Sequence, residues 1–508
     1  MTIQKLVLDG LHLILSWNTL LVLVLGVLLG MVAGALPGFT SGNTCAIALP
    51  LTIGMSTLNA LVFMGAIYTG SQCGGGIPAI LFNVPGTPQA ASTALDGFKM
   101  TRKGKPDLAL GACIGASAIG GVVSAIIAIL ATNPMAQFAL KFGPAEMFVL
   151  ALMGVAVLTS LVGDDLKKGL LTAALGFLVA SVCADPYYGL PRCTFGFLEL
   201  YDEVPLIATL IGLFAIPSLL QLANMDYIVD VPLEEAKNIG KVSKILKGFL
   251  ETIKRPLKVL KGALIGAVIG AIPGTGANIA TFVSYGSAVA LSKHPETFGE
   301  GEIEGVIACE SANNGCVGGA MIPAFALGVP GSGTTAIMLS ALLLHGIVPG
   351  PYVVRNYGGT VYGFLLVLLI ASLCCIPLGI LFSKFFAKLT VVRSYIIVPV
   401  IGLLCVIGSF SERQLVFDMY LLLIFGLLGV LLQANKYPLI PFIFGIVLGN
   451  LTEKTFLQAI SISLGDPMIF FKSSICKILW AIIILVIAAP KLIRWLGNRK
   501  RKAAAGKA

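Results

Sequence analysis

The chain has 508 residues, of which 57% are hydrophobic and only 11% charged, and its mean hydropathy is +0.95. Soluble domains carry roughly 25% charged residues, so this composition excludes an ordinary soluble protein and indicates a polytopic membrane protein. A net charge of +10 would suggest nucleic-acid binding in a soluble protein. Here the cations fall in loops and at the carboxyl end, where they serve as orientation signals, and we expect no nucleic-acid partner.

Continuous apolar runs recur along the whole chain. Each is long enough, or nearly long enough, to cross a hydrocarbon core of ~30 Å, and backbone groups in lipid must find their partners within the segment, which favours helices. The sequence therefore predicts an all-α polytopic fold of about 10–14 membrane segments. The clearest runs are Leu20–Leu36, Leu108–Leu130, Met147–Leu161, Phe364–Phe382 and Ile478–Ala489.

Two Pro-Gly breaks occur twice, in the same order. Gly34-Ala35-Leu36-Pro37-Gly38 returns as Gly270-Ala271-Ile272-Pro273-Gly274, 236 residues later (274 − 38). Asn83-Val84-Pro85-Gly86-Thr87 returns as Gly328-Val329-Pro330-Gly331-Ser332, 245 residues later (331 − 86). This pattern indicates a duplicated unit. We expect a first membrane repeat over 1–222, a cytoplasmic linker over 223–256, a second membrane repeat over 257–497 and a basic cytoplasmic tail over 498–508.

In chain order, residues 1–16 are mildly amphipathic and are expected at the membrane interface. A first helix should then end at Leu36, because proline removes a backbone donor and glycine admits unusual dihedral angles. The short stretch 73–82 is expected as a separate piece, since it is too short to cross alone. The remaining expected helices span about 43–53, 58–72, 107–131, 144–162, 167–184, 204–222, 278–291, 303–316, 359–383, 394–409, 414–432, 438–450 and 474–496.

Equivalent loops of the two repeats carry opposite charge bias. The 97–106 loop is strongly basic whereas 350–358 has only Arg355, and the next pair reverses, with Lys141 alone in 132–143 but three cations in 383–393. Cytoplasmic loops are enriched in Lys and Arg, so this reversal predicts two inverted repeats related by an axis in the membrane plane. The linker and the carboxyl end then lie in the cytoplasm, and the acidic stretch 199–203 and the amino terminus lie outside.

The residues beside the breaks are the candidate binding site. A helix interrupted at mid-membrane exposes unpaired N–H and C=O groups, and such groups persist only against protein, water or a ligand. Helix N-termini attract anions, and unwound carbonyls hold Na⁺. As carboxylate contacts we predict Pro85, Gly86, Thr87, Pro330, Gly331, Ser332, Gly333, Thr334 and Thr335. As coupling-ion or second-carboxylate contacts we predict Thr40, Ser41, Gly42, Asn43, Thr275, Gly276, Asn278, Glu310, Asn313 and Asn314.

Each of these assignments has a structural alternative. Glycines scattered in membrane helices usually serve close helix packing, whereas those adjoining the paired prolines favour function. Glu310 is either an intramembrane proton or Na⁺ site or a carboxylate near a helix end that faces loop water, and its counterpart in the first repeat, under the 245 offset, is Gly65. Asp96 is interpreted as a boundary residue. We expect no catalytic residues, no cofactor and no metal other than Na⁺ at the coupling-ion residues.

The blocks Gly34–Gly42, Gly74–Asp96, Gly270–Asn278, Glu310–Gly319 and Val329–Thr335 resemble the large membrane subunit of the tripartite tricarboxylate transporter family. The resemblance covers nearly the whole chain. It implies a bacterial inner-membrane secondary transporter that is driven by Na⁺ or H⁺ and takes up tricarboxylates or related organic carboxylates. It also implies two partners, a small membrane subunit and a periplasmic substrate-binding protein; a homo-oligomer is left open.

Two other functions remain open from the residues alone. The first is a channel-like or scaffold subunit with no coupled substrate site of its own, which predicts no gradient-dependent accumulation. The second is an intramembrane enzyme, which would need two acidic or nucleophilic groups at one depth, and the sequence offers only Glu310.

Overall fold

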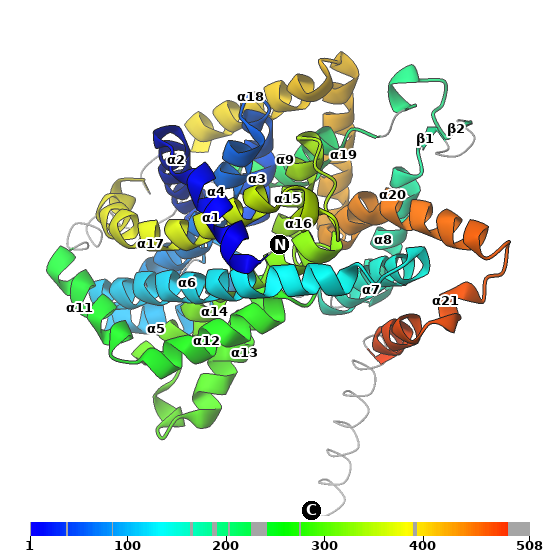
Figure 1. The fold of residues 1–508 in the computed structure, drawn as a ribbon. Helices are drawn as coiled ribbons and strands as arrows, with labels where there is room; N and C mark the ends of the chain where they lie inside the picture. The colour runs from blue at the N-terminus through cyan, green and yellow to red at the C-terminus, as the bar shows by residue number, and fades with distance from the viewer. Residues whose placement is uncertain are drawn as a thin grey trace, which may run out of the picture. The chain divides into compact units, whose positions relative to one another are not determined.

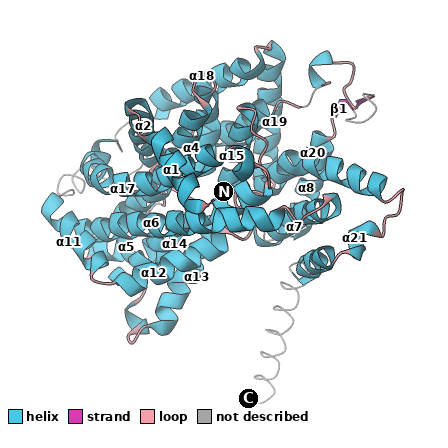
Figure 2. Ribbon diagram, viewed as in Figure 1, coloured by secondary structure: helices cyan, strands magenta, loops and turns pink. Residues whose placement is uncertain are grey.

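The computed structural model describes residues 2–36, 39–83, 85–162, 166–184, 190–201, 204–224, 241–273, 276–389 and 394–485. Within these ranges the regular structure is almost entirely helical (Figure 2). The strands in the same ranges are β1 (Cys183–Ala184) and β2 (Pro191–Arg192), which pair antiparallel. The predicted all-α fold class is thereby confirmed.

The helices follow the chain as drawn in Figure 1. The amino-terminal half contains α1 (Ile3–Ile14), α2 (Trp17–Gly34), α3 (Ser41–Ala48), η1 (Leu49–Thr52), α4 (Thr57–Phe82), η2 (Pro88–Ala90), α5 (Ala91–Arg102), α6 (Pro106–Ala139), α7 (Pro144–Val162), α8 (Leu166–Ala180), η3 (Leu198–Leu200) and α9 (Leu206–Ala223). The carboxyl-terminal half contains α11 (Val242–Ile253), α12 (Pro256–Gly270), α13 (Gly276–Leu291), η4 (Pro295–Thr297), α14 (Ile303–Leu327), α15 (Gly333–Leu344), α16 (Val353–Asn356), α17 (Gly358–Leu389), α18 (Ser394–Arg413), α19 (Val416–Ala434), α20 (Leu439–Ile462) and α21 (Ile469–Lys472).

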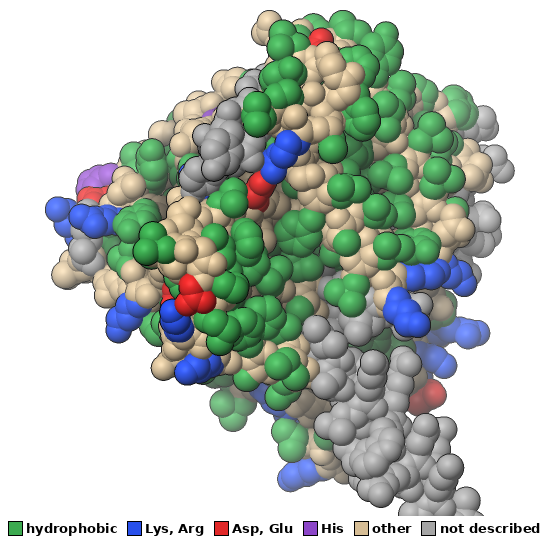
Figure 3. All heavy atoms as spheres, turned by 90° about the vertical axis from the view of Figure 1, so that its right-hand side faces the viewer, with side chains coloured by type: hydrophobic (Ala, Val, Ile, Leu, Met, Phe, Trp, Pro, Cys, Tyr) green, Lys and Arg blue, Asp and Glu red, His purple; other side chains and the backbone are tan. Residues whose placement is uncertain are grey.

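Five of the described helices are long and apolar enough to cross a membrane, and shorter apolar helices accompany them. The long ones run over Trp17–Gly34, Pro106–Ala139, Gly358–Lys384, Val416–Ala434 and Leu439–Ile462. Hydrophobic side chains are spread widely over the face shown in Figure 3, and charged side chains form small groups between them. Such a surface suits lipid rather than water as its solvent.

Two sequence expectations about the broken helices are wrong. The stretch 73–82 is not a separate piece, because α4 runs without interruption to Phe82 through three glycines and Pro78. Likewise α14 continues past Cys316 to Leu327 and contains Pro323. Close packing against neighbouring helices, described below for the glycines, explains why these residues do not end either helix.

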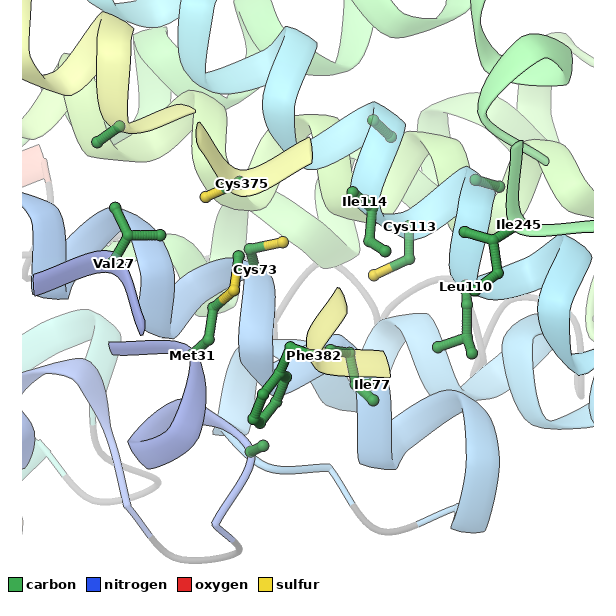
Figure 4. Packing of buried hydrophobic residues seen from close by; sticks show 14 of the residues in the cluster. Val27, Met31, Cys73, Ile77, Leu110, Cys113, Ile114, Ile245, Cys375 and Phe382 are labelled. Carbon is green, nitrogen blue, oxygen red and sulfur yellow. The ribbon is translucent and has the colours of Figure 1, made fainter. Parts of the chain in front are cut away.

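The described chain divides into two compact units, residues 1–139 with 205–431 and residues 140–204 with 432–508. The first unit has a continuous hydrophobic core between α2, α4, α6, α11, α14 and α17, part of which appears in Figure 4. Residues 242–253, inside the predicted linker, form α11, which buries Ile245 and Thr252 against α6. Residues 225–240 and the basic tail lie outside the described residues. The two compact units do not coincide with the predicted repeats, because the repeats are defined by duplicated sequence and the units by contacts. The repeat boundaries remain a prediction.

The same helix-on-helix contacts occur in both halves of the first unit. A Cβ on Gly30 of α2 would lie 2.4 Å from the Ile67 oxygen of α4, and a Cβ on Gly266 of α12 would lie 2.3 Å from the Ala312 oxygen of α14. These pairs are related by the two sequence offsets, 236 for α2 and α12 and 245 for α4 and α14. The helix pairs α2/α4 and α12/α14 therefore pack alike at positions that the two sequence offsets relate.

The second unit is built around α20, which packs against α7 and α8. A Cβ on Gly176 of α8 would lie 2.0 Å from the Phe442 oxygen of α20, so only glycine permits this approach. The Phe148 ring of α7 contacts Phe456 and Phe470 at centroid distances of 5.2 and 4.7 Å. Arg192 of β2 forms an ion pair with Glu453 of α20.

Candidate functional site

The first break separates α2 from α3, and α3 begins with a satisfied cap. Thr40 Oγ1 accepts the Asn43 N–H at 3.0 Å and donates to Asn43 Oδ1 at 2.9 Å. A capping threonine of this kind satisfies one of the four N–H groups that a helix start leaves without an intrahelical partner. Pro37 and Gly38 themselves lie outside the described residues.

The fourth break leads into α15, which begins with a capping box. Ser332 Oγ accepts the Thr335 N–H at 3.3 Å, and Thr335 Oγ1 accepts the Ser332 N–H at 2.7 Å. Gly333 is the first residue of the helix. Pro330 and Gly331 precede the cap, and a Cβ on Gly331 would lie 2.8 Å from the Gly270 oxygen, where α12 ends. The third and fourth breaks therefore pack against each other.

The structure brings the starts of α3 and α15 together across the two repeats. Ser41 Oγ and Thr334 Oγ1 are 2.9 Å apart, and both side chains are buried. A Cβ on Gly42 would lie 3.7 Å from Thr334 Oγ1. Each helix start carries a partial positive charge of roughly half an elementary charge. Two such ends beside paired hydroxyls form an arrangement that can receive an anion.

Sequence reasoning missed Tyr68 as a neighbour of this pair. Its hydroxyl on α4 lies 3.5 Å from Ser332 Oγ, and the side chain is 1% exposed. The offset of 245 makes Tyr68 the counterpart of Asn313, which was already a candidate. The symmetry could therefore have identified Tyr68.

The second break packs on the first and on α4. The Gly86 N–H donates to the Gly75 oxygen at 3.2 Å, and a Cβ on Gly86 would lie 2.1 Å from the Gly34 oxygen. Pro85, which precedes Gly86, is half-buried. Thr87 is fully buried, yet its Oγ1 has no hydrogen-bond partner. A Cβ on Gly75 would lie only 2.3 Å from that oxygen, so the segment is closely fitted to α4.

The third break, at Pro273-Gly274, has fewer buried contact residues than the sequence predicted. Thr275 lies outside the described residues. Gly276 opens α13 with a φ of +64°, a conformation that favours glycine. Asn278 is exposed, and its carbonyl oxygen accepts the Thr281 hydroxyl at 3.0 Å. The helix α13 contacts η2, and under the two sequence offsets this pair is the counterpart of α3 and α15.

Glu310 lies two turns inside α14 and is fully buried, so the alternative of a carboxylate facing loop water does not fit. Its Oε1 accepts the Thr93 hydroxyl at 2.6 Å and its Oε2 accepts the Ser117 hydroxyl at 2.7 Å. Sequence reasoning missed both hydroxyls, because they come from α5 and α6 and no local spacing connects them to α14.

The two asparagines after Glu310 face different neighbours. Asn313 Nδ2 donates to the Gln72 oxygen of α4 at 3.1 Å. The Asn314 Cβ instead lies 3.7 Å from the position of a Cβ on Gly121 of α6. The Asn313 Oδ1 and both polar atoms of the Asn314 side chain have no hydrogen-bond partner. Asn313 therefore faces α4 and Asn314 faces α6.

Asp96 is more than a boundary residue. It is fully buried in α5, and its Oδ1 accepts the N–H groups of Gly299, Gly301 and Glu302 at 2.8–2.9 Å. Its Oδ2 accepts the Tyr285 hydroxyl at 2.9 Å. One carboxylate thus connects the first repeat to the loop before α14 in the second.

The four breaks pack in pairs in the described residues, the first with the second and the third with the fourth, and the first meets the fourth through Ser41 and Thr334. A pocket between α12, α13 and α14 is lined by Lys258, Lys261, Gly262, Ser284, Ala288, Leu291, Glu304 and Ala308. None of these residues adjoins a break, so a cavity shared by all four breaks remains a prediction.

Long apolar helices, interrupted at duplicated breaks, define a multi-pass helical membrane protein. The particular family follows from comparison: residues 20–444 match the model of the "Tripartite tricarboxylate transporter TctA family", and the chain belongs to it. The resemblance read from the motif blocks is thereby confirmed.

Two relatives come from Agrobacterium vitis. The chain is 34% identical over 457 residues to an uncharacterized 52.8 kDa protein in the TAR-I ttuC' 3' region, covering 90% of each chain. It is 34% identical over 211 residues to an uncharacterized protein in the TAR-II ttuC' 3' region, covering 41% of this chain and 87% of the relative. No solved structure matches the chain significantly.

Proposed function

We propose that this chain is the large transmembrane subunit of a secondary-active tripartite transporter that imports a tricarboxylate or a related organic carboxylate by alternating access. Uptake is coupled to Na⁺ or H⁺. A periplasmic binding protein delivers the substrate, and a small membrane subunit completes the complex in a bacterial inner membrane. Membership of the TctA family supports the tripartite assembly, and inverted repeats with broken helices suit alternating access.

The observation that carries this proposal is the contact between Ser41 and Thr334. The two hydroxyls come from the first turns of α3 and α15, in different repeats, and they meet in a buried position. A carboxylate can replace this hydroxyl–hydroxyl contact by accepting from both groups. Hydroxyls and helix dipoles hold an anion without a fixed cation, so the substrate can leave on the other side when the two repeats move apart.

The test is uptake into proteoliposomes by the double variant Ser41→Ala/Thr334→Val. It removes the two hydroxyls but leaves both helix caps in place. Hydrogen bonds to charged groups contribute about 1.5–3 kcal/mol each, so KM for the transported acid should rise roughly tenfold or more per hydroxyl. The matched control is Ser340→Ala on α15, whose hydroxyl only donates to the Ala336 oxygen at 3.0 Å.

The assay uses radiolabelled di- and tricarboxylates, with candidate binding proteins added and with Na⁺ present or absent. Unchanged kinetics in the double variant would remove this contact from the substrate site. A wild-type protein that never accumulates any acid against a gradient would instead favour the channel-like or scaffold function. The two results are independent, so the site and the transport activity are tested separately.

A further inference from the structure

The carboxylate of Glu310 is enclosed by three helices. Thr93 of α5 and Ser117 of α6 each donate a hydrogen bond to one of its oxygens, at 2.6 and 2.7 Å. All three residues are at most 1% exposed. A Cβ on Gly76 of α4 would lie 2.7 Å from both Glu310 Oε1 and Cys113 Sγ, so the space beside the carboxylate is filled.

No cationic side chain balances this carboxylate among the ion pairs of the described residues. Burial of an unpaired carboxylate is strongly unfavourable, and hydrogen bonds from neutral hydroxyls offset only part of that cost. Either a bound cation or a proton must therefore neutralise Glu310 during part of its working cycle. A proton adds almost no volume, so protonation of Glu310 is compatible with its closely packed surroundings.

The titratable groups around Glu310 supply no alternative charge partner. Cys113 faces it from α6, Cys73 of α4 lies beside Cys113, and Cys309 precedes it on α14. All three thiols are fully buried. On α5 the acid nearest to Cys309 is Asp96, whose oxygens already accept four hydrogen bonds. None of these groups is a cation.

A buried amide oxygen on the same helix as Glu310 has no hydrogen-bond partner. Asn313 lies one turn further along α14 and is a hydrogen-bonding neighbour of Glu310. Its Oδ1 is buried and has no partner, while one of the two N–H groups of its Nδ2 donates to the Gln72 oxygen. The hydroxyls of Thr93 and Ser117 donate to the ionised form of Glu310, and Asn313 Oδ1 remains an unused acceptor one turn further along the helix.

The fold does not need a carboxylate at this position. Under the offset of 245, the counterpart of Glu310 in α4 is Gly65, and a Cβ there would lie 2.6 Å from the Phe364 ring. The equivalent place in the first repeat is therefore filled by an aromatic side chain. Since α2/α4 and α12/α14 pack alike, the acid in one repeat alone indicates a function rather than a packing role.

Glu310 also lies beside the segment that holds the second break. Gly76 contacts Glu310, and its neighbour Gly75 accepts the Gly86 N–H and contacts Thr87. We propose that Glu310 is the proton-carrying residue of this transporter, binding one proton and releasing it in each transport cycle. This inference rests on the proposed function and identifies the coupling ion as H⁺. In the reaction, one O–H bond of the carboxyl group forms from a proton on one side of the membrane and breaks to release it on the other.

The first experiment needs no substrate. Infrared difference spectra of the purified full-length protein, recorded between acidic and alkaline pH, should contain the C=O band of a protonated carboxyl group that disappears in Glu310→Gln. The matched control is Glu304→Gln, on the same helix but paired with Lys258 at 3.0 Å, and it should keep the band. Ser117→Ala, which removes one hydrogen bond, should shift the band; this variant decides the question if Glu310→Gln does not fold. A titrating band that neither variant alters would overturn the proposal.

The second experiment separates H⁺ from Na⁺ and the residue from the transport activity. In proteoliposomes with citrate as the probe, Glu310→Gln should lose accumulation driven by a pH gradient but retain citrate counterflow. Loss of both activities in a folded variant, or retention of both, would contradict the assignment. If Na⁺ stabilises the wild type against heat more than K⁺ does, and Glu310→Gln abolishes this difference, then Glu310 binds Na⁺ and the assignment of a proton is wrong. If the wild type moves neither citrate nor any other di- or tricarboxylate, the proposed function is contradicted, and the infrared result still decides the protonation of Glu310.

Discussion

At the scale of single residues, glycine sets the distance between the helices that carry the breaks. In α2 and α12, Gly30 and Gly266 lie directly against backbone oxygens of the neighbouring helix. A side chain there cannot be accommodated by a rotamer change, because the obstacle is main chain. The interpretation of most scattered glycines as packing residues therefore agrees with the contacts, and the two halves use them at equivalent positions.

Gly30→Ala and Gly266→Ala should each destabilise the protein by about 2 kcal/mol or more, since overpacking a fitted interface costs roughly 1–3 kcal/mol. Gly286→Ala is the control, because a Cβ at that helical glycine of α13 meets nothing within 4 Å. It should be neutral or stabilising by roughly 0.5–1 kcal/mol, as alanine is the better helix former. Apparent melting temperatures in detergent report all three variants. Equal effects of the three substitutions would show that backbone contact does not limit α2 and α12.

At the scale of elements, α4 and α14 end in the same way. Both contain a proline five residues before a left-handed C-cap, Pro78 before Asn83 and Pro323 before Gly328. The Asn83 φ is +59° and the Gly328 φ is +71°. Glycine and asparagine are the residues that adopt this conformation most readily at a helix end. The sequence predicted the breaks from Pro-Gly pairs, but these caps, which stand before those pairs, are what end the helices.

Exchanging the two caps should therefore be tolerated. Asn83→Gly and Gly328→Asn should change the stability by less than about 0.5 kcal/mol, because both residues accept the left-handed region. Asn83→Val and Gly328→Val should each cost about 1–2 kcal/mol or more from Cβ crowding. Thermal unfolding of the four variants is the measurement. A harmless valine at either position would mean that this helix end does not depend on its cap.

At the scale of the whole molecule, each half supplies a helix to the other. The helix α9 of the first half packs on α18 and α19 of the second, while α20 of the second half packs on α7 and α8 of the first. Hydrophobic runs were enough to place most helices, including α7 and α9, since a spanning helix is encoded locally. The partners of Ser41 and Glu310 were not predictable, because Thr334, Thr93 and Ser117 are 193 to 293 residues away and follow no period.

The inverted orientation of the repeats is a prediction that labelling can test. Lys105 and Arg355 are both exposed and lie in equivalent loops of opposite charge bias. Because basic loops stay in the cytoplasm, Lys105→Cys should react with a membrane-impermeant maleimide only in inside-out vesicles. Arg355→Cys should react only in right-side-out vesicles. Both variants are made in a Cys193→Ser background, since Cys193 is the exposed cysteine among the described residues.

The protein provides its own reference for this labelling. Cys193 precedes the acidic stretch 199–203, which the same charge argument places outside. In the wild type it should therefore react from the side that labels Arg355→Cys and not from the side that labels Lys105→Cys. If Lys105→Cys and Arg355→Cys react from one side, the two repeats have the same orientation. Alternating access by inverted halves would then lose its physical basis, because equivalent breaks would face the same membrane surface.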